Sequence, residues 1–133
     1  MLALDHKKQA VLALLTTAFN SNLPVSEKRR AMSRLMDAEG YIQHSPGLAN
    51  GLESLLELIA GFDRDFPGYA ISVERVIAEG DLVFAHCHYT YGPRKRRGKA
   101  IAEIFRFEND RIVEHWDVIQ DVPAESRNSN GMF

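Results

Sequence analysis

Residues Ala100 to Gln120 read AIAEIFRFENDRIVEHWDVIQ, and this stretch organises the rest of the chain. Two runs of alternating apolar and polar residues flank a polar triplet, Glu108-Asn109-Asp110, which is typical of a β-hairpin. The runs also carry Glu103, His115 and Asp117 among β-branched and aromatic residues. Because a buried charge must find a partner, these ionisable groups indicate a polar site.

The length of the turn decides which of these residues share a face. A two-residue Asn109-Asp110 loop would set Glu103 opposite Trp116, whereas a three-residue loop with Asp110 left-handed sets Glu103 opposite His115. We predict the three-residue loop, because Asp tolerates that conformation. One face then holds Ile101, Glu103, Phe105, Phe107, Val113, His115, Asp117 and Ile119. An imidazole between two carboxylates suits acid/base chemistry, although a merely satisfied polar network would look the same.

Composition restricts the class of protein. The 133 residues predict one domain spanning 1–133, and 45% hydrophobic with 26% charged residues is ordinary for a globular protein. A formal net charge of -2 argues against nucleic-acid and membrane partners. The one cysteine, Cys87, cannot form an intrachain disulfide, and neither a signal peptide pattern nor a membrane-spanning run is present in the sequence. We therefore predict a cytoplasmic protein.

Three stretches with helical spacing precede the strands, over residues 5–21, 27–39 and 51–66. Ser26 is predicted to cap the second helix, and Asn50 with Glu53 to form a capping box for the third. The second helix should expose a basic side made of Lys28, Arg29, Arg30 and Arg34. Between the last two helices, residues 41–47 should form a short extended piece that runs into a turn, because Pro46 disfavours a helical Ser45.

Two strands are predicted before the hairpin, at residues 69–78 and 82–91. The second is apolar on both faces and should be central. His86 and His88 share one of its faces and could bind a metal together with His44 or His115 and a carboxylate, although the spacing does not require it. Cys87 points the other way and should pack as a small apolar residue.

A strongly basic loop, Gly92-Pro93-Arg94-Lys95-Arg96-Arg97-Gly98, connects this strand to the hairpin. It is either a solvated tip or a device that steers an anionic substrate towards a nearby mouth. His44 is also open to two interpretations. It lies where an extended segment leaves the core, so its side chain either faces a cavity or belongs to a surface turn.

Three helices followed by a mostly antiparallel sheet form an α+β layout. The order resembles the cone-shaped fold of the nuclear-transport-factor-2-like superfamily, and most closely its SnoaL-like polyketide-cyclase and aldol-condensation group. The resemblance rests on the motifs at residues 41–46, 78–81, 104–106, 112–118 and 130–133. It implies three N-terminal helices on a curved sheet, with an apolar pocket at the open end of the cone.

The resemblance also implies roles for individual residues. It places Glu103, His115 and Asp117 inside the pocket. His44 matches by position the general base of the steroid-isomerase branch, where a carboxylate is usual, and Glu103 matches an acid that stabilises an oxyanion. Asp117 lies near the acid/base aspartate of the polyketide cyclases. For contact with the substrate we predict Tyr41, His86, His88 and Phe105.

These roles combine into a predicted reaction on a small apolar carbonyl compound. His44 or the Asp117–His115 pair removes a proton next to the carbonyl, and a Glu103 kept protonated by burial donates a hydrogen bond to the enolate oxygen. Aldol-type ring closure or isomerisation follows, and no cofactor or metal is expected. The alternatives are a non-catalytic binding protein for an apolar ligand and a structural dimer module. A homodimer through the outer sheet face, with Ile104, Trp116 and Val118, is predicted in either case.

Overall fold

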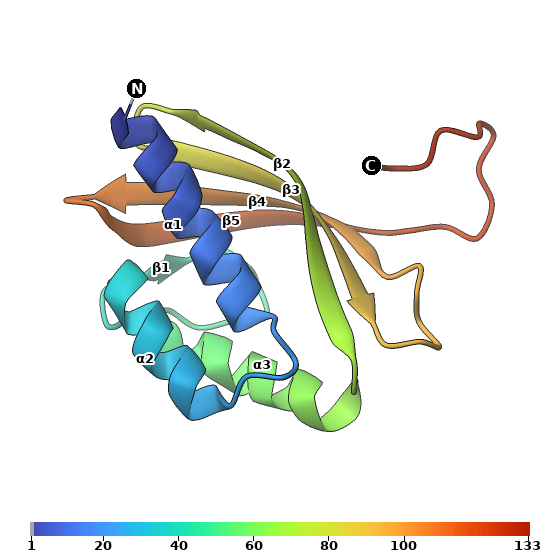
Figure 1. Cartoon of the computed structure of the whole chain (residues 1–133), viewed down its shortest axis with the longest axis horizontal. Helices are drawn as coiled ribbons and strands as arrows, with labels where there is room; N and C mark the ends of the chain where they lie inside the picture. The colour runs from blue at the N-terminus through green and yellow to red at the C-terminus, as the bar shows by residue number, and fades with distance from the viewer. Residues whose placement is uncertain (1) are drawn as a thin grey trace.

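The computed structural model describes residues 2–133, and shows three helices packed on one face of a curved five-stranded sheet (Figure 1). The helices are α1 (Leu2–Ala18), α2 (Val25–Leu35) and α3 (Leu52–Asp65). The strands are β1 (Ile42–Gln43), β2 (Tyr69–Glu79), β3 (Leu82–Tyr91), β4 (Lys99–Glu108) and β5 (Arg111–Asp121). This arrangement confirms the predicted α+β class. Among residues 2–133, no helix is both long and apolar enough to cross a membrane.

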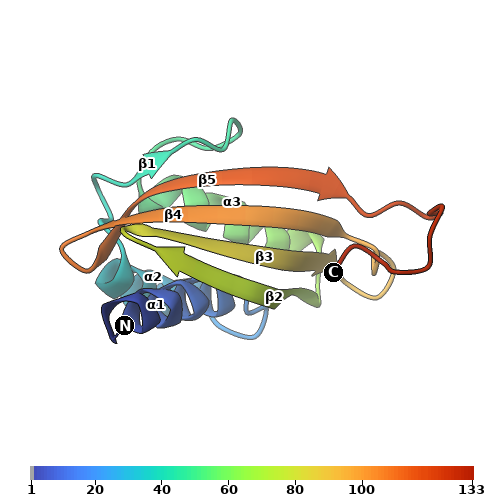
Figure 2. The same cartoon turned by 90° about the horizontal axis from the view of Figure 1, so that it is seen from above.

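The sheet order is β1-β5-β4-β3-β2, and only the β1–β5 pair is parallel (Figure 2). Strand β3 lies inside the sheet between β4 and β2, although the central strand is β4 and not β3 as predicted. The β3 residues Val83, Ala85, Cys87 and Tyr89 alternate inwards and are almost completely buried. Burial raises the pKa of the Cys87 thiol to about 12, so Cys87 is protonated at neutral pH and packs as an apolar residue.

The predicted three-residue hairpin turn is wrong. Glu108 pairs with Arg111, so the loop is Asn109-Asp110, and both residues have positive φ (50° and 63°) as a type I′ turn requires. The register then shifts between Arg106 and Phe107, which leaves Val113 as an extra residue on β5. The bulge shifts the pairing of the two strands by one residue. As a result, Glu103 lies opposite Asp117 and Phe105 lies opposite His115.

The predicted caps of α2 and α3 are also wrong. Helix α2 begins after Pro24, which makes no side-chain capping bond, and α3 begins after Gly51. Proline at a helix start needs no donor, and its fixed φ suits the entry to a helix. The side chain of Asn50 instead accepts a hydrogen bond from the backbone of Gln43 at 2.9 Å. Asn50 therefore holds β1 in place next to the site described below.

Lys28 is buried in the core, contrary to the predicted solvated position. Its ammonium group donates to the Tyr69 hydroxyl at 2.6 Å and lies 3.7 Å from Asp63. The Tyr69 hydroxyl in turn donates to Asp63 at 2.6 Å. Burial lowers the pKa of Lys28, and Asp63 opposes that change. This network ties α2 and α3 to β2, the strand at the sheet edge.

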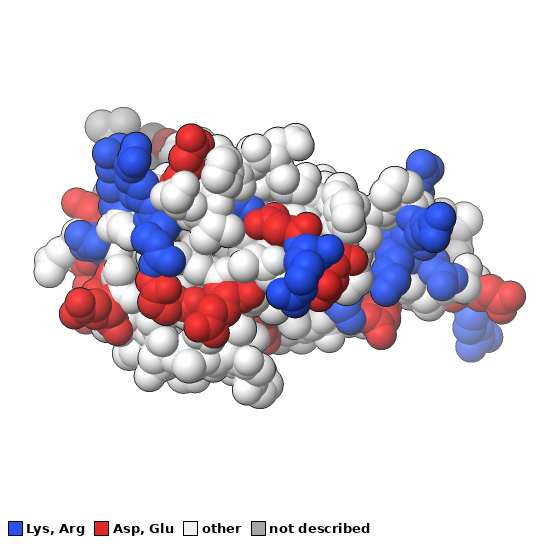
Figure 3. Space-filling model, turned by 90° about the horizontal axis from the view of Figure 1, so that it is seen from below, with Lys and Arg blue, Asp and Glu red and all other residues white. Residues whose placement is uncertain are grey.

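The charged groups are spread over the surface, and one group of Lys and Arg side chains gathers at the end of the molecule that carries the β3–β4 loop (Figure 3). The loop begins and ends with Gly92 and Gly98, which have positive φ values of 96° and 60°. A Cβ on Gly98 would lie 1.7 Å from the Tyr89 carbonyl oxygen. The loop conformation thus depends on glycine at this position.

We expect Gly98→Ala to destabilise the protein more than Gly80→Ala. Both glycines have a φ of 60°, but a Cβ on Gly80 would meet nothing within 4 Å. Gly80→Ala should therefore cost about 1 kcal/mol from backbone strain alone, and Gly98→Ala about 2 kcal/mol more from the clash. Urea unfolding of both variants measures the difference. Equal losses of stability would mean that the backbone of Gly98 does not lie this close to the Tyr89 carbonyl oxygen.

Candidate active site

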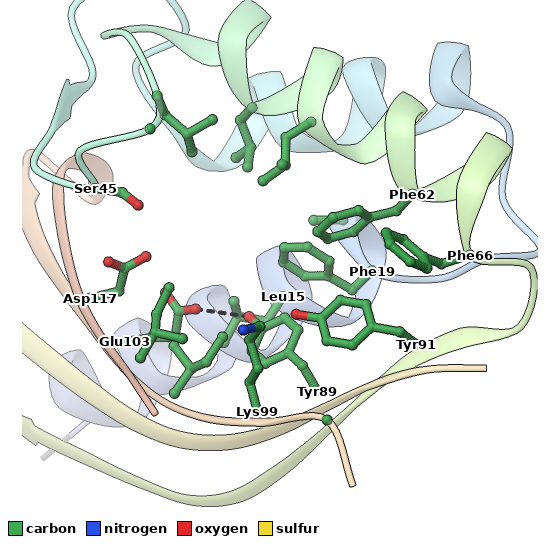
Figure 4. A pocket seen from close by; sticks show the side chains of 18 of the residues that line it. Leu15, Phe19, Ser45, Phe62, Phe66, Tyr89, Tyr91, Lys99, Glu103 and Asp117 are labelled. Carbon is green, nitrogen blue, oxygen red and sulfur yellow. Dashed lines mark hydrogen bonds between the residues drawn. The ribbon is translucent and has the colours of Figure 1, made fainter. Parts of the chain in front are cut away.

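A cavity of about 1130 Å³ lies between the helices and the inner face of the sheet. Its walls are mainly apolar and come largely from α1, α3, the residues that directly follow these two helices, and the C-terminal end of β3. Figure 4 shows Phe19, Phe62, Phe66 and Tyr91 in this wall. Aromatic edges meet in this wall, with the Phe62 and Tyr91 rings 5.5 Å apart. A space of this size and lining suits a compact apolar molecule.

One end of the cavity is polar. Glu103 on β4 and His115 on β5 are each only 6% exposed, and the carboxylate Oε2 is in direct hydrogen-bond contact with His115 Nε2. The Tyr89 hydroxyl on β3 donates to the other carboxylate oxygen at 2.9 Å (Figure 4). Every polar atom of the Glu103 carboxylate therefore has a partner, as burial requires.

Gln43 on β1 fixes the protonation of the imidazole. The backbone N–H of Ser45 donates to Gln43 Oε1 at 3.0 Å, which identifies that atom as the amide oxygen. His115 Nδ1 lies 2.7 Å from the same oxygen. Since an amide oxygen only accepts hydrogen bonds, Nδ1 must carry a proton and donate it.

The contact between His115 and Glu103 holds a second proton. A neutral imidazole with its proton on Nδ1 presents a lone pair at Nε2, and this lone pair would repel an ionised carboxylate. A proton therefore lies between Nε2 and Oε2, and the pair is either imidazolium with carboxylate or imidazole with carboxylic acid. In both forms the pair is neutral overall and has one transferable proton.

Asp117 faces Glu103 across the β4–β5 ladder and lines the same cavity. Its carboxylate points towards the Ser45 hydroxyl (Figure 4). Burial raises the pKa of Asp117, and the nearby Glu103 raises it further, whereas His115 and a hydrogen bond from Ser45 oppose the change. A half-buried carboxylate with a raised pKa is a stronger base than one in water.

Two tyrosines complete the polar end. Tyr41 stacks on His115 with ring centroids 6.3 Å apart, and Tyr89 contacts Glu103. Burial raises the pKa of both hydroxyls well above their usual range, with Glu103 adding to the effect. Both hydroxyls are therefore neutral donors at physiological pH.

The cavity brings together five of the eight residues predicted for the site: Tyr41, Glu103, Phe105, His115 and Asp117. His44 lies elsewhere, on the outer face of the sheet. Its ring stacks on Trp116 with centroids 4.9 Å apart, and its Nε2 contacts Glu114 at 2.7 Å. Because side chains alternate along an extended segment, Gln43 and Ser45 face the cavity and His44 cannot.

His86 and His88 are also on the outer face, contrary to the predicted contact with substrate. Both rings stack against Phe133, with centroids 5.5 Å and 4.2 Å away. The sheet separates them from His115, and in the described residues the one group of three or more possible metal ligands contains neither histidine, so the metal site considered for His86 and His88 with His44 or His115 and a carboxylate does not form. Val118 and Ile77 on this outer face are 66% and 60% exposed. The homodimer through this face stays a prediction.

A different group of ligands could hold a metal. One ligand atom from each of Glu103, His115 and Asp117 lies within 4.8 Å of the other two. Carboxylate and imidazole ligands suit several divalent metals. However, Glu103 and Nε2 of His115 already satisfy one another, so a metal would have to displace their shared proton.

Sequence reasoning missed Gln43, Ser45 and Tyr89. A signal for Tyr89 existed, because Tyr89 has the same parity as Cys87 and therefore faces inwards with it. Gln43 and Ser45 flank His44 in the extended segment, and the assignment of His44 to the cavity placed them on the wrong face.

We expect His115 to carry a proton on Nδ1 in the folded protein. Gln43 Oε1 accepts from this nitrogen, and the Ser45 N–H prevents the amide from reversing. Nitrogen-15 NMR of the imidazole side chains measures the tautomer directly. Gln43→Leu should release the ring and populate the Nε2-protonated tautomer, with Asn22→Leu in a remote loop as the control. A signal from an unprotonated Nδ1 in the wild-type protein would contradict the hydrogen bond from His115 Nδ1 to Gln43 Oε1.

Comparisons with known proteins agree with the fold. Residues 9–115 match the SnoaL-like domain family. No curated protein matches the chain. Among solved structures, a proposed isomerase of the SnoaL-like family from Agrobacterium tumefaciens is 13% identical with a TM-score of 0.72, covering 87% of this chain and 98% of that one.

Two further structures are similar. A proposed polyketide cyclase from Bacillus cereus is 18% identical with a TM-score of 0.70, covering 86% of this chain and 74% of that one. IdmH, a proposed polyketide cyclase from Streptomyces antibioticus, is 21% identical with a TM-score of 0.64, covering 85% and 91%. At these identities the likeness shows the fold, and the chemistry has to come from the site itself.

Proposed function

Because this chain belongs to the SnoaL-like domain family, we propose that it is an acid/base enzyme that cyclises or isomerises a small apolar carbonyl compound. One observation supports this most strongly. A carboxylate with a raised pKa, Asp117, stands beside a buried pair that holds a transferable proton, at the polar end of an apolar cavity. This is the separation of acid and base that proton transfer at carbon needs.

The first step of the proposed reaction is removal of a proton. Asp117 takes the proton from the carbon next to the substrate carbonyl, and the electron pair of the C–H bond moves to form an enolate. The hydrogen bond between Glu103 and His115 opens, and the group that keeps the shared proton donates it in a hydrogen bond to the enolate oxygen, which stabilises the enolate charge. Tyr41, held neutral by burial, is a second donor at this end of the cavity.

Two outcomes of the enolate fit the same residues. In cyclisation, the enolate carbon attacks a second carbonyl of the same molecule, and the new alkoxide takes the proton from Asp117. In isomerisation, Asp117 returns the proton to a different carbon. Both routes end with Asp117 ionised, so the site is ready for another turnover.

The experiment that tests the proposal is hydrogen–deuterium exchange of apolar ketones in D₂O, followed by proton NMR. Loss of the signal next to the carbonyl faster than in buffer supports the enzyme. Binding of a ketone without any exchange would contradict it and favour the non-catalytic binding protein, which the same apolar cavity would serve. Metal analysis of the same sample adds a second check, since a stoichiometric metal bound by Glu103, His115 and Asp117 would replace their shared proton.

A further inference from the structure

The loop between β3 and β4 places four consecutive cations at the mouth of the cavity. Arg94, Lys95, Arg96 and Arg97 are exposed, and all four line the cavity together with the aromatic wall. Figure 1 shows this loop at the end of the sheet, near the C-terminal end of α3, and Figure 3 shows Lys and Arg side chains gathered there. We call these four residues the cationic rim.

The backbone holds the cationic rim in a defined position. The Lys95 N–H donates to the Gly92 carbonyl at 3.0 Å, and the Tyr91 N–H donates to the Lys95 carbonyl at 3.2 Å. His88 Nε2 contacts the Arg97 carbonyl oxygen at 2.7 Å, and the Gly98 carbonyl accepts from Val122 at 3.1 Å. His88 thus supports the loop from the outer face. The charges are therefore presented at the mouth by a fixed turn.

Within residues 2–133, the rim cations have no acidic partner. In the described residues 2–133, the acidic group of the mouth, Asp121, pairs with Lys99 at 2.6 Å, and no carboxylate forms an ion pair with any of the four rim cations. Lys95 lies over the Phe66 ring, 5.0 Å from its centroid, at the border between the rim and the apolar wall. The mouth therefore has a positive potential that the protein itself does not neutralise.

We infer that the ligand of this cavity is amphipathic, with an apolar body and a negatively charged oxygen group, such as a carboxylate, that binds at the cationic rim. The inference rests on the proposed function and names the class of substrate. The carboxylate of Asp117 at the inner end repels a carboxylate of the ligand, so the two ends of the cavity orient the ligand. Glu103 is the fifth residue after Gly98, which corresponds to about 16 Å of extended strand. The anionic group and the reacting carbonyl should lie about this far apart.

The test compares two probes with the same apolar body and different charge. Pyrenebutyrate carries a carboxylate, and pyrenebutanol is its neutral counterpart. Titration of both into the wild-type protein, followed by pyrene fluorescence, should show about tenfold tighter binding of pyrenebutyrate at low salt. The difference should shrink as the ionic strength rises, because the rim cations are exposed to solvent.

Two matched variants locate the effect. Arg94→Gln/Arg96→Gln/Arg97→Gln removes three rim charges, and Lys8→Gln/Arg30→Gln/Arg34→Gln removes three charges from α1 and α2, none of which lines the cavity. The rim variant should bind both probes with the affinity of the neutral probe. The helix variant should keep the tenfold difference.

Equal binding of the two probes to wild type would overturn the inference and leave the proposed acid/base site standing. A preference that persists in the rim variant would also overturn it, because the anion would then bind elsewhere. Failure of both probes to bind would show that the cavity does not accept apolar ligands, and it would contradict the inference and the proposed function together.

Discussion

Asp117→Asn is expected to slow proton exchange at the substrate by about 10²- to 10⁴-fold, the usual contribution of a positioned general base. An amide cannot accept the proton, but it keeps the shape of the side chain and can still hydrogen-bond with Ser45. Glu103 cannot replace Asp117, because both of its oxygens already contact Tyr89 and His115. Binding of an apolar ketone should be almost unchanged.

The measurement is the deuterium exchange rate of a bound ketone, with ligand affinity determined on the same samples. Glu114→Gln is a matched control, since Glu114 lies on the same strand but contacts His44 and Arg106 on the outer face. If Asp117→Asn exchanges as fast as wild type, Asp117 is not the base. If the control loses as much activity, the loss comes from the strand and not from the cavity.

The same variant should be more stable than wild type at neutral pH. A raised pKa means that the folded state binds the Asp117 proton more tightly than the unfolded chain does. This stabilisation is fully present below the unfolded value of 3.8 and is lost as the pH rises through the folded pKa. At pH 7 the ionised carboxylate therefore disfavours folding, and an amide removes that cost.

Thermal unfolding of the wild-type protein and of Asp117→Asn across the pH range measures the direction of this stability difference. Asp117→Asn should have the higher melting temperature at pH 7, and its advantage should vanish below about pH 4, where Asp117 is protonated in both states. A lower melting temperature for the variant at pH 7 would mean that the carboxylate is held by favourable contacts. A gain in stability with a loss of activity is the expected behaviour of a catalytic group held in an unfavourable environment.

The inner face of the hairpin could be predicted from sequence, although its register could not. Alternation places Glu103, His115 and Asp117 together whenever the number of residues between them has the right parity. The three-residue turn and the observed two-residue turn with a bulge have the same parity, so the incorrect turn still predicted the correct face. Which residues stand directly opposite each other depends on the bulge, and no local pattern indicates it.

The facing of isolated residues was harder to predict than that of a hairpin. His44 follows a strand of only two residues, Ile42–Gln43, so no alternation could fix its side, and its match to a family position favoured the wrong face. For His86 and His88 the alternation was visible, and the inward position of Cys87 implied that both histidines point outwards. Lys28 could not have been found, since its burial depends on Tyr69 and Asp63, which the chain brings near only on folding.

Replacing Glu103 should separate its role in folding from its role in chemistry. In Glu103→Gln, the amide oxygen can accept from Tyr89 and the amide N–H can donate to the lone pair at His115 Nε2, because Nδ1 retains its proton towards Gln43. The network is then fully satisfied, so the free energy of unfolding should change by less than about 1 kcal/mol. The shared proton is gone, so proton exchange at the substrate should fall by about 10²-fold or more.

Glu103→Leu, unlike Glu103→Gln, is expected to destabilise the folded protein, by about 3–5 kcal/mol, as loss of one partner from a buried pair does. The apolar side chain leaves the Tyr89 hydroxyl and His115 Nε2 without partners in a region where both are almost fully buried. Denaturant unfolding of the two variants measures the difference. If Glu103→Leu is as stable as Glu103→Gln, water must reach the Tyr89 hydroxyl and His115 Nε2 and hydrogen-bond to them. The transferable proton of the wild-type pair would then be exposed to solvent. A Glu103→Gln protein with normal exchange would instead show that another donor, such as Tyr41, stabilises the enolate oxygen.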